Sequence, residues 1–401
     1  MLAPLHPALI PMTSPRTFFL LLFWLLASAF SALAQDSSGD DEPKVWPKCL
    51  ECKTVGWLEC PDKLHKKEDL EHEHEVGFCS VVQGCETCAG VGRIDCDDCE
   101  RPDVDAELAK AAERLPAYVE LWKGYNKEME FELNMVVTEH FELVFEMESL
   151  KVGKKRLKRH ELTHLYAQRM ETLYADYLAT MTAKPSDFTQ RFRVLVWQQD
   201  ADQQRGSLVF CRASAGAGVR LLGVDPSYSM CANKRYHADD ESIHRNLVHS
   251  VTHLMLSAQK PIAWMGNKKK GWADAGLAHY FEDKYFNMCD NYCYQEQNTN
   301  VDFKGGKWRP AVRKMVMEDD LPGVGTVFSR NVDNLLLNEH AVAFSYVDFL
   351  LAKDAAKFNQ LMIEFRKDRE TREALSEIFG LTPISFEIEW KQWVKDTYPL
   401  R

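Results

Sequence analysis

In the first half of the chain, the pattern of hydrophobic and polar positions predicts two helices with a strand between them. Residues 104–130 and Leu157–Met181 repeat apolar side chains at the spacing of an amphipathic helix. Phe131–Met147 alternates in part between apolar and polar positions, which predicts a strand. In the first stretch the helical period rests on Ala106, Leu108, Ala111, Ala112 and Leu115.

The second half begins with short apolar runs and continues as helix. Arg193–Gln198 predicts a buried strand, and a second strand is expected near Val219–Val224, where glycines mark the turns. From Ile243 to the end the pattern is mostly helical. Strands followed by helices predict an α+β domain with a mostly helical C-terminal half.

Residues 1–34 have the pattern of a secretory signal. Arg16 precedes the apolar run Phe18–Phe30, and Ala32–Ala34 gives a small-residue cleavage pattern. A polar linker follows at 35–45. An uncleaved anchor is the alternative, and only then do we expect contact with a membrane. We therefore expect an extracytoplasmic protein, either secreted or periplasmic.

Composition and charge narrow the function classes. The chain has 401 residues, of which 45% are hydrophobic, so it is neither wholly disordered nor collagen-like. The net charge of −11 argues against binding to nucleic acid, which needs clustered positive charge. Of the 12 cysteines, eight lie between Cys49 and Cys99. This concentration marks a small unit that needs metal or disulfide support.

Two cysteine segments align without a gap at an offset of 36 residues: Cys49–Lys63 and Cys85–Cys99. A Cys-x-x-Cys pair can place two thiolates on one ion, and two such pairs complete a tetrahedral zinc site. The second copy is complete, whereas Lys63 in the first copy stands where Cys99 stands in the second. The predicted zinc ligands are Cys49, Cys52, Cys60, Cys79, Cys85, Cys88, Cys96 and Cys99.

Several alternatives remain open for this segment. The missing ligand can come from Cys79 or from His65, His72 or His74. Zinc can serve stability alone, or the module can bind a partner. Cys-x-x-Cys in an exported protein can also exchange disulfides, and disulfides can replace zinc in an oxidising compartment.

The glycines of the repeat carry a resemblance. Cys88-Ala-Gly90-Val-Gly92 matches the Cys-x-x-Cys-x-Gly-x-Gly unit of the zinc domain of DnaJ-type chaperones, and Cys52-Lys-Thr-Val-Gly56 keeps only the later glycine. The resemblance covers about 50 residues and includes no J domain. It implies that distant cysteine pairs share an ion, which leaves the grouping of the cysteines open.

A second motif lies in the helical half. His249 and His253 are four residues apart, so on a helix they project from one face and suit one Zn²⁺. With the segment Gly271–Glu282, they resemble the gluzincin (peptidase-MA-like) metallopeptidases, whose pattern is His-Glu-x-x-His and then Trp-x-x-Glu-Gly-Leu-Ala-x-Tyr. The resemblance covers roughly 135–401 and implies a thermolysin-like domain, with Phe344–Leu351 in the helix behind the site.

The departures from this pattern decide the expected chemistry. Ser250 stands at the position of the general base and Ala275 at the position of the third zinc ligand. A serine hydroxyl cannot take a proton from zinc-bound water near neutral pH, and general acid–base help is worth about 10²–10⁴-fold. Catalytic zinc also normally has three protein ligands. We therefore expect no catalytic residues and no hydrolytic activity.

One alternative to an inactive site is that another side chain replaces the missing third ligand. His279 is one turn past Ala275 on the same helix face, so His249, His253 and His279 can form a three-histidine zinc site. Otherwise the histidine pair is a remnant and His279 is partly exposed. Asp274 is about 100° from Ala275 around the helix and is not expected at the site. His340 and Tyr346 are expected to line the same cleft.

The remaining cysteines and a lysine run carry weaker expectations. Cys211, Cys231, Cys289 and Cys293 predict one or two disulfides in an exported chain. Lys268–Lys270 is expected to be a solvated loop.

Taken together, the sequence predicts a signal (1–34), a linker (35–45), a cysteine-rich zinc module (46–100), a helical connector (101–134) and a peptidase-like domain (135–401). The favoured function is a non-catalytic protein that binds a peptide or protein. The alternatives are a zinc hydrolase with a rebuilt site and a chaperone-like or thiol-redox module. The sequence leaves the oligomeric state open.

Overall fold

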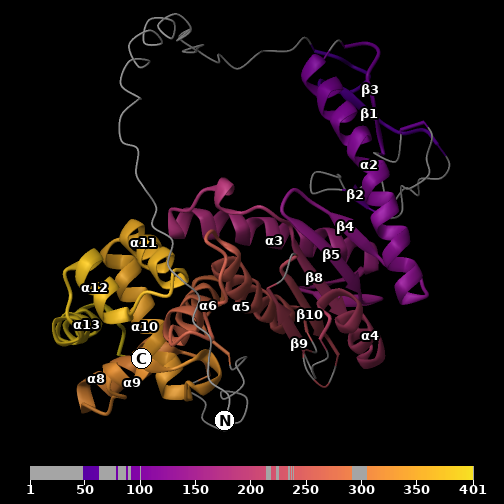
Figure 1. Cartoon of the computed structure of the whole chain (residues 1–401). Coiled ribbons are helices and arrows are strands. Elements are labelled where there is room, and N and C mark those ends of the chain that lie inside the picture. Colours follow the sequence, from indigo (N-terminus) through magenta and orange to yellow (C-terminus); the bar gives the residue numbers. More distant parts are fainter. Residues whose placement is uncertain are drawn as a thin grey trace, which may run out of the picture. The chain divides into compact units, whose positions relative to one another are not determined.

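Six strands form one mixed sheet in the described part of the chain. They are β2 (Phe78–Cys79), β4 (Met135–Val137), β5 (Phe141–Glu146), β8 (Phe192–Trp197), β9 (Gly218–Leu221) and β10 (Ser227–Cys231). Their order is β2-β4-β5-β8-β10-β9 (Figure 1). β5, β8 and β10 are parallel, β4 and β9 pair antiparallel with β5 and β10, and β2 pairs antiparallel with β4.

The structure is a computed structural model, and it describes residues 48–62, 78–79, 87–88, 92–99, 101–213, 218–222, 225–233, 235, 237, 239–290 and 305–400. The predicted signal and linker lie outside these residues. Within them, none of the helices combines the length and the apolar character needed to span a bilayer.

Helices cover both faces of the sheet, which explains why β8 is buried along its whole length. Val194 and Val196 face α3 (Arg159–Met181) and α5 (Asp240–Ala258). The alternate residues Leu195 and Trp197 face the other side, where α2 (Pro102–Met129) and α4 (Asp200–Cys211) pack. Because successive side chains of a strand point to opposite faces of the sheet, β8 contributes to two separate hydrophobic cores.

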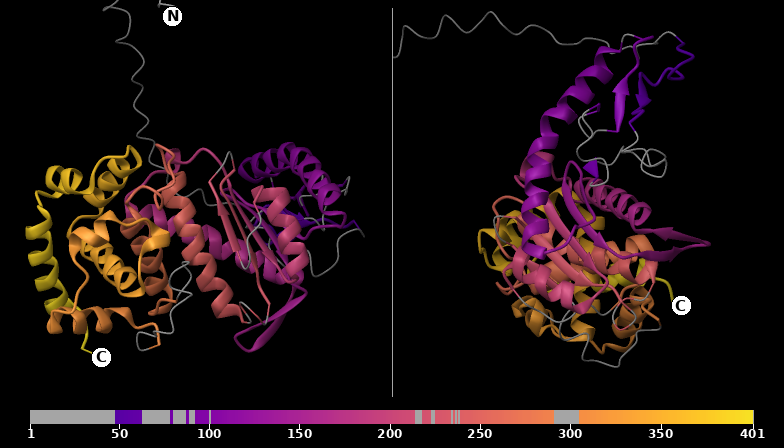
Figure 2. Two further views of the ribbon diagram at one scale, coloured as in Figure 1. Left: turned by 60° about the horizontal axis from the view of Figure 1, so that its bottom comes forward. Right: turned by 90° about the vertical axis from the view of Figure 1, so that its right-hand side faces the viewer.

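The C-terminal region is helical. Its elements are α6 (Gly271–Phe286), α8 (Trp308–Glu318), α9 (Val324–Ser329), α10 (Leu337–Lys353), α11 (Ala355–Arg366), α12 (Thr371–Phe379) and α13 (Pro383–Thr397). The later helices, orange to yellow in Figure 2, gather around α10. A Cβ atom on Gly276 of α6 would lie 2.5 Å from the Ala343 carbonyl oxygen of α10, so the two helices pack closely at this glycine.

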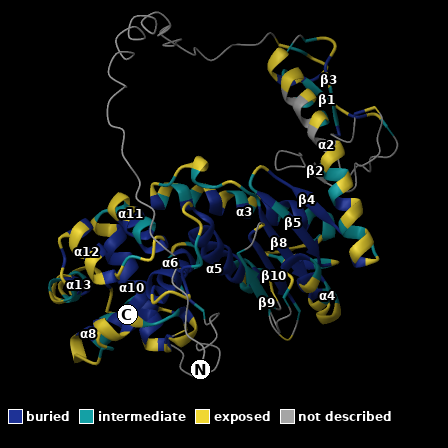
Figure 3. Cartoon of the chain, viewed as in Figure 1, coloured by how far each residue is buried: buried dark blue, intermediate teal, exposed yellow. Residues whose placement is uncertain are grey.

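Burial is deepest where α5, α6 and α10 meet, as the dark blue helices of Figure 3 show. α6 packs between α5 on one side and α10 on the other. The polar side chains of α5 and α6 that face each other are therefore enclosed by the main core.

Short elements complete the chain. β1 (Trp57–Glu59) and β3 (Arg93–Asp95) form an antiparallel pair in the cysteine-rich segment. β6 (Ser149–Val152) and β7 (Lys155–Lys158) form a hairpin before α3. Two 3₁₀ turns, η3 and η4, lie at Pro185–Asp187 and Val332–Asn334.

The predicted α+β class is confirmed, and most of the expected elements are present. The helix expected at 104–130 is α2, and the strand expected at Arg193–Gln198 is β8. The single strand expected over Phe131–Met147 is wrong, because that segment turns at residues 138–140 and pairs with itself as β4 and β5. β10 was missed, since its sequence Ser-Tyr-Ser-Met-Cys has few of the residues that signal a strand.

Two weaker expectations are also corrected. Cys211, Cys231 and Cys289 are free thiols, so no disulfide joins them, and Cys293 lies outside the described residues. The Lys268–Lys270 run is not wholly solvated, because Lys270 is buried and its Nζ lies 3.2 Å from an Asp368 oxygen.

Candidate metal centres

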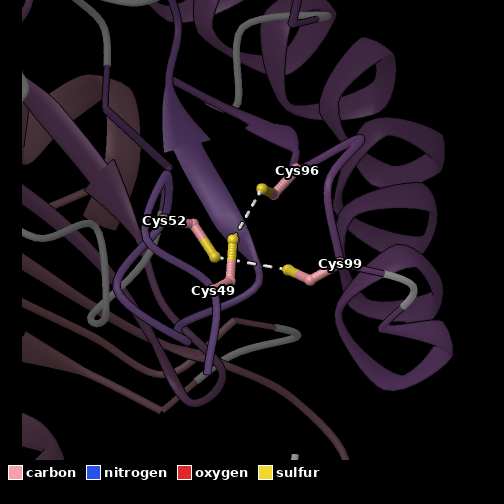
Figure 4. Close-up of side chains that lie close together, drawn as sticks. All are labelled: Cys49, Cys52, Cys96 and Cys99. Carbon is pink, nitrogen blue, oxygen red and sulfur yellow. Dashed lines mark hydrogen bonds between the residues drawn. The ribbon is translucent and has the colours of Figure 1, made fainter. Parts of the chain in front are cut away.

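Four cysteines converge on one point in the cysteine-rich segment (Figure 4). The sulfur atoms of Cys49, Cys52, Cys96 and Cys99 all lie within 4.8 Å of one another. Cys49 Sγ is 3.7 Å from Cys96 Sγ, and Cys52 Sγ is 3.3 Å from Cys99 Sγ. Tetrahedral zinc with Zn–S bonds of 2.3 Å separates its sulfurs by about 3.8 Å. The four thiols can therefore hold one metal ion.

Backbone N–H groups donate hydrogen bonds to the sulfur atoms of two cysteines of the segment, which favours the thiolate form. Gly56 N donates to Cys52 Sγ at 3.2 Å, and the equivalent Gly92 N donates to Cys88 Sγ at 3.1 Å. Both glycines have positive φ, at 86° and 80°. Burial alone would raise the pKa of Cys52, but hydrogen bonds with the Cys99 thiol and with Gly56 lower that pKa to about 6. These hydrogen bonds therefore favour the thiolate form of Cys52.

The two repeat copies are related by a local two-fold axis. β1 and β3 pair about the match of Leu58 with Ile94. Cys60 N donates to Gly92 O at 3.0 Å, and Cys96 N donates to Gly56 O at 3.1 Å. The same operation that relates Cys52 to Cys88 relates Cys60 to Cys96. The four-cysteine site thus combines the first pair of one copy with the last pair of the other.

Of the other predicted cysteine ligands, Cys60 and Cys88 are buried together in a small cluster with Ile94 and are not part of the group of four. The backbone of Cys79 lies in β2, opposite Val136 of β4. The remaining candidates lie outside the described residues: His65, His72, His74 and Cys85.

A second cluster lies between α5 and α6, deep in the main core. His249 Nε2 and His253 Nε2 are 3.0 Å apart. Glu282 of α6 contacts His249 Nδ1 through Oε1, and the same oxygen lies 3.0 Å from His279 Nδ1. All four residues are 0% exposed. The donors of His249, His279 and Glu282 lie within 4.8 Å of one another, so they can hold a metal ion.

The structure brings the three predicted histidines together: the ring centroid of His249 lies 4.7 Å from that of His253 and 4.8 Å from that of His279. Of the three, His249 and His279 group with Glu282 as donors that can hold one ion. The three-histidine metal site itself stays a prediction. The alternative expectation that His279 is partly exposed is wrong, because the residue is fully buried and the Trp308 ring lies against its ring in a tilted arrangement, with centroids 4.3 Å apart.

Asp274 also corrects the sequence analysis. Its Oδ1 lies 2.8 Å from His253 Nδ1, and its side chain is 1% exposed. His249, the earlier histidine of α5, contacts Glu282, the later carboxylate of α6, whereas His253 contacts the earlier carboxylate, Asp274. These two helices therefore run antiparallel. Asp274 and Ala275 project from α6 in different directions, but the Asp274 side chain still faces α5.

Neither position of the expected catalytic carboxylates carries an acid. Ser250 faces Tyr228 of β10, whose pKa is raised by burial and partly lowered by hydrogen bonds with Ser250 and Asn246. Ala275 is packed in the main hydrophobic core. His340 lies beside the cluster, with its ring 5.6 Å from that of His279, whereas Tyr346 packs against Trp272.

The imidazoles are held in the neutral form that binds metal. Burial, followed by the neighbouring His253 and His279, places the pKa of His249 well below its usual value. Burial and Arg220 also lower the pKa of His253, while Asp274 opposes this shift. A neutral imidazole keeps one nitrogen lone pair for an ion or a hydrogen bond.

Glu282 is the site residue that sequence reasoning missed. It lies seven residues after Ala275 and three after His279, so it shares their face of α6. Extending the helical face by two turns from Ala275 would have found it.

Two cavities lie elsewhere on the large domain. One, of about 420 Å³, is lined by Asp283, Trp308, Arg309 and Asp348 among others. The second, of about 710 Å³, follows the ends of β5, β8 and β10. Neither is lined by His249, His253 or Glu282.

Comparisons with protein-family models and with curated proteins give no match to this chain.

Proposed function

We propose that this protein is an exported, non-hydrolytic relative of the gluzincin metallopeptidases that binds a peptide or protein partner. A DnaJ-like cysteine module with structural zinc accompanies the peptidase-like domain. The proposal is carried by the buried histidine cluster, in which both nearby carboxylates are engaged by imidazole Nδ1 atoms. A general base must instead reach the water that attacks the substrate.

The burial of the cluster supports the same conclusion. His249, His253, His279 and Glu282 are 0% exposed, so a peptide bond has no path to them in this conformation. Ser250 and Ala275 supply neither a base nor a ligand. What remains are paired polar groups inside a core, which suit a structural role better than a reaction.

Zinc is proposed for the four-cysteine site because four thiolates in tetrahedral geometry favour it and leave no open position for substrate. The segment around β1 and β3 has few buried apolar side chains, among them the cysteines themselves. Metal binding therefore contributes most of the stability of this segment.

A peptide partner is proposed at β9. This strand is the last of the sheet among the described residues, and it pairs only with β10. Its outer edge presents backbone N–H and C=O groups, which an extended peptide can pair with by adding a strand.

Hydrolysis is tested with the full-length protein supplied with zinc. We expect no chelator-sensitive cleavage of casein-like substrates above the level of the His249→Ala variant. Cleavage that is abolished both by chelator and by His249→Ala would overturn the non-hydrolytic assignment.

Peptide binding is tested with a library of extended peptides and fluorescence anisotropy. Neighbouring N–H groups of an edge strand alternate between β10 and the open side. Val219→Pro and Arg220→Pro each remove one backbone N–H from β9. The variant that removes the N–H on the open side should lose peptide binding and stay folded. The other variant serves as the matched control. Equal binding by both folded variants would exclude β9 as the docking edge.

A further inference from the structure

A chain of close polar contacts through the buried cluster starts at Asp274. Its Oδ1 lies 2.8 Å from His253 Nδ1, and because a carboxylate oxygen accepts from an imidazole N–H, this contact favours a proton on Nδ1. In the neutral imidazole the other nitrogen, Nε2, then carries a lone pair.

The next contact fixes the second imidazole. His253 Nε2 lies 3.0 Å from His249 Nε2, so His249 must donate a proton to it. The lone pair of neutral His249 is then on Nδ1, which faces Glu282 Oε1 in a close contact. A lone pair and a carboxylate oxygen repel each other unless a proton or a cation lies between them.

A third donor reaches the same point. His279 Nδ1 lies 3.0 Å from Glu282 Oε1. The other carboxylate oxygen, Oε2, accepts from Asp290 N at 2.7 Å, which fixes the orientation of the carboxylate. Two imidazole nitrogens and one carboxylate oxygen make the set of three protein ligands that divalent transition metals take.

From this arrangement we propose that a divalent transition-metal ion binds to His249 Nδ1, His279 Nδ1 and Glu282 Oε1. His253 and Asp274 do not touch the ion in this arrangement. They form the hydrogen-bonded chain that selects the tautomer of His249 and directs its lone pair toward Glu282. The ion therefore lies on the side of His249 away from His253.

Charge balance supports the ion. Asp274 and Glu282 are both fully or almost fully buried, and both lie against imidazoles. One divalent cation balances two buried carboxylates.

The competing position lies between the two facing Nε2 atoms of His249 and His253. There both Nδ1 atoms would donate to their carboxylates, but within the described residues no third donor completes the set. A third arrangement has no ion and an imidazolium in the cluster. The experiment separates these three arrangements.

The test measures metal per chain by mass spectrometry in the full-length protein after zinc loading, beside Glu282→Gln and Asp274→Asn. These variants make the same carboxylate-to-amide change on the same helix. Cys49→Ser identifies the ion of the cysteine site. Glu282→Gln should lose one ion that Cys49→Ser keeps. Asp274→Asn should keep that ion with affinity reduced about 10–100-fold, as for a residue behind a ligand.

Three results would overturn the proposal. Zinc held by the wild-type protein only at cysteine sites favours the imidazolium. Loss of the ion in Asp274→Asn and His253→Ala but not in Glu282→Gln favours the Nε2 position. Anomalous diffraction from wild-type crystals locates the ion without any variant, and a peak between the two Nε2 atoms contradicts the assignment. None of these readouts depends on hydrolysis, so the proposed function and this inference fail separately.

Discussion

The cysteine site and the histidine cluster are both sets of metal-binding side chains, but they occupy opposite physical settings. Cys49 and Cys99 are partly exposed, and the described part of their segment has only a small hydrophobic cluster. His249 and Glu282 are fully buried among the packed helices α5, α6 and α10. In the first region an ion would substitute for a core. In the second the core already exists, and an ion would only balance charge inside it.

The largest expected effect is the loss of the cysteine module on chelation. Structural zinc is worth about 10–16 kcal/mol in small zinc domains, so its removal, or Cys49→Ser, should unfold the segment around β1 and β3. The sheet and C-terminal helices should persist. Hydrogen exchange read by mass spectrometry checks this, with Cys211→Ser as the control cysteine change. Simultaneous unfolding of both regions would remove the distinction between them.

The histidines of the core should make the metal-free large domain sensitive to acid. A histidine in an unfolded chain has a pKa of about 6.5. Burial lowers the pKa of His249 and His253, and that of His244 to about 4. At a pH between the pKa values of these histidines in the folded and unfolded states, the unfolded state binds more protons than the folded state. Stability is therefore complete above about pH 6.5 and falls as the pH is lowered, by at most about 1.4 kcal/mol per unit and histidine.

Urea unfolding of metal-free protein at pH 7, 6 and 5 measures this dependence. His244→Gln should reduce the slope, because it removes one titrating group. The same slope in that variant would mean that His244 does not contribute.

Packing of α6 against α10 should tolerate no side chain at Gly276. Gly276→Ala places a methyl group 2.5 Å from the Ala343 carbonyl oxygen and should cost about 1–3 kcal/mol. Gly124→Ala in α2 meets no atom within 4 Å and should stabilise by about 0.5–1 kcal/mol. Thermal unfolding of the two variants measures the difference, and shifts of the same sign would refute the packing argument.

The smallest expected effect is chemical. In metal-free protein the segment around β1 and β3 is expected to unfold, so at pH 7 Cys52 should be alkylated at about the rate of an ordinary exposed thiol. Cys231, whose pKa burial and Asp200 raise to about 12, should react far more slowly. Peptide mass spectrometry after iodoacetamide treatment compares them, and equal rates would contradict the raised pKa of Cys231.

Sequence patterns were sufficient for the α+β class and for the long helices because these depend on local periodicity. They were insufficient for contacts between elements. The grouping of Cys49 and Cys52 with Cys96 and Cys99 depends on the pairing of β1 with β3, which spacing alone leaves open.

The histidine cluster shows the same limit. The motif located His249 and His253, yet the carboxylates that meet them are Glu282 and Asp274. These contacts follow from the antiparallel packing of α5 and α6. An argument confined to the neighbours of Ala275 on one helix could not find them.

The two-fold relation within the cysteine module has a consequence for its tolerance to mutation. The first repeat contributes Cys49 and Cys52 to the four-cysteine site, and the second contributes Cys96 and Cys99. Lys63 of the first repeat corresponds to Cys99 of the second, so the lost cysteine is not one of these four ligands. Redundancy of this kind lets one half of a duplicated module decay while the other continues to hold the fold.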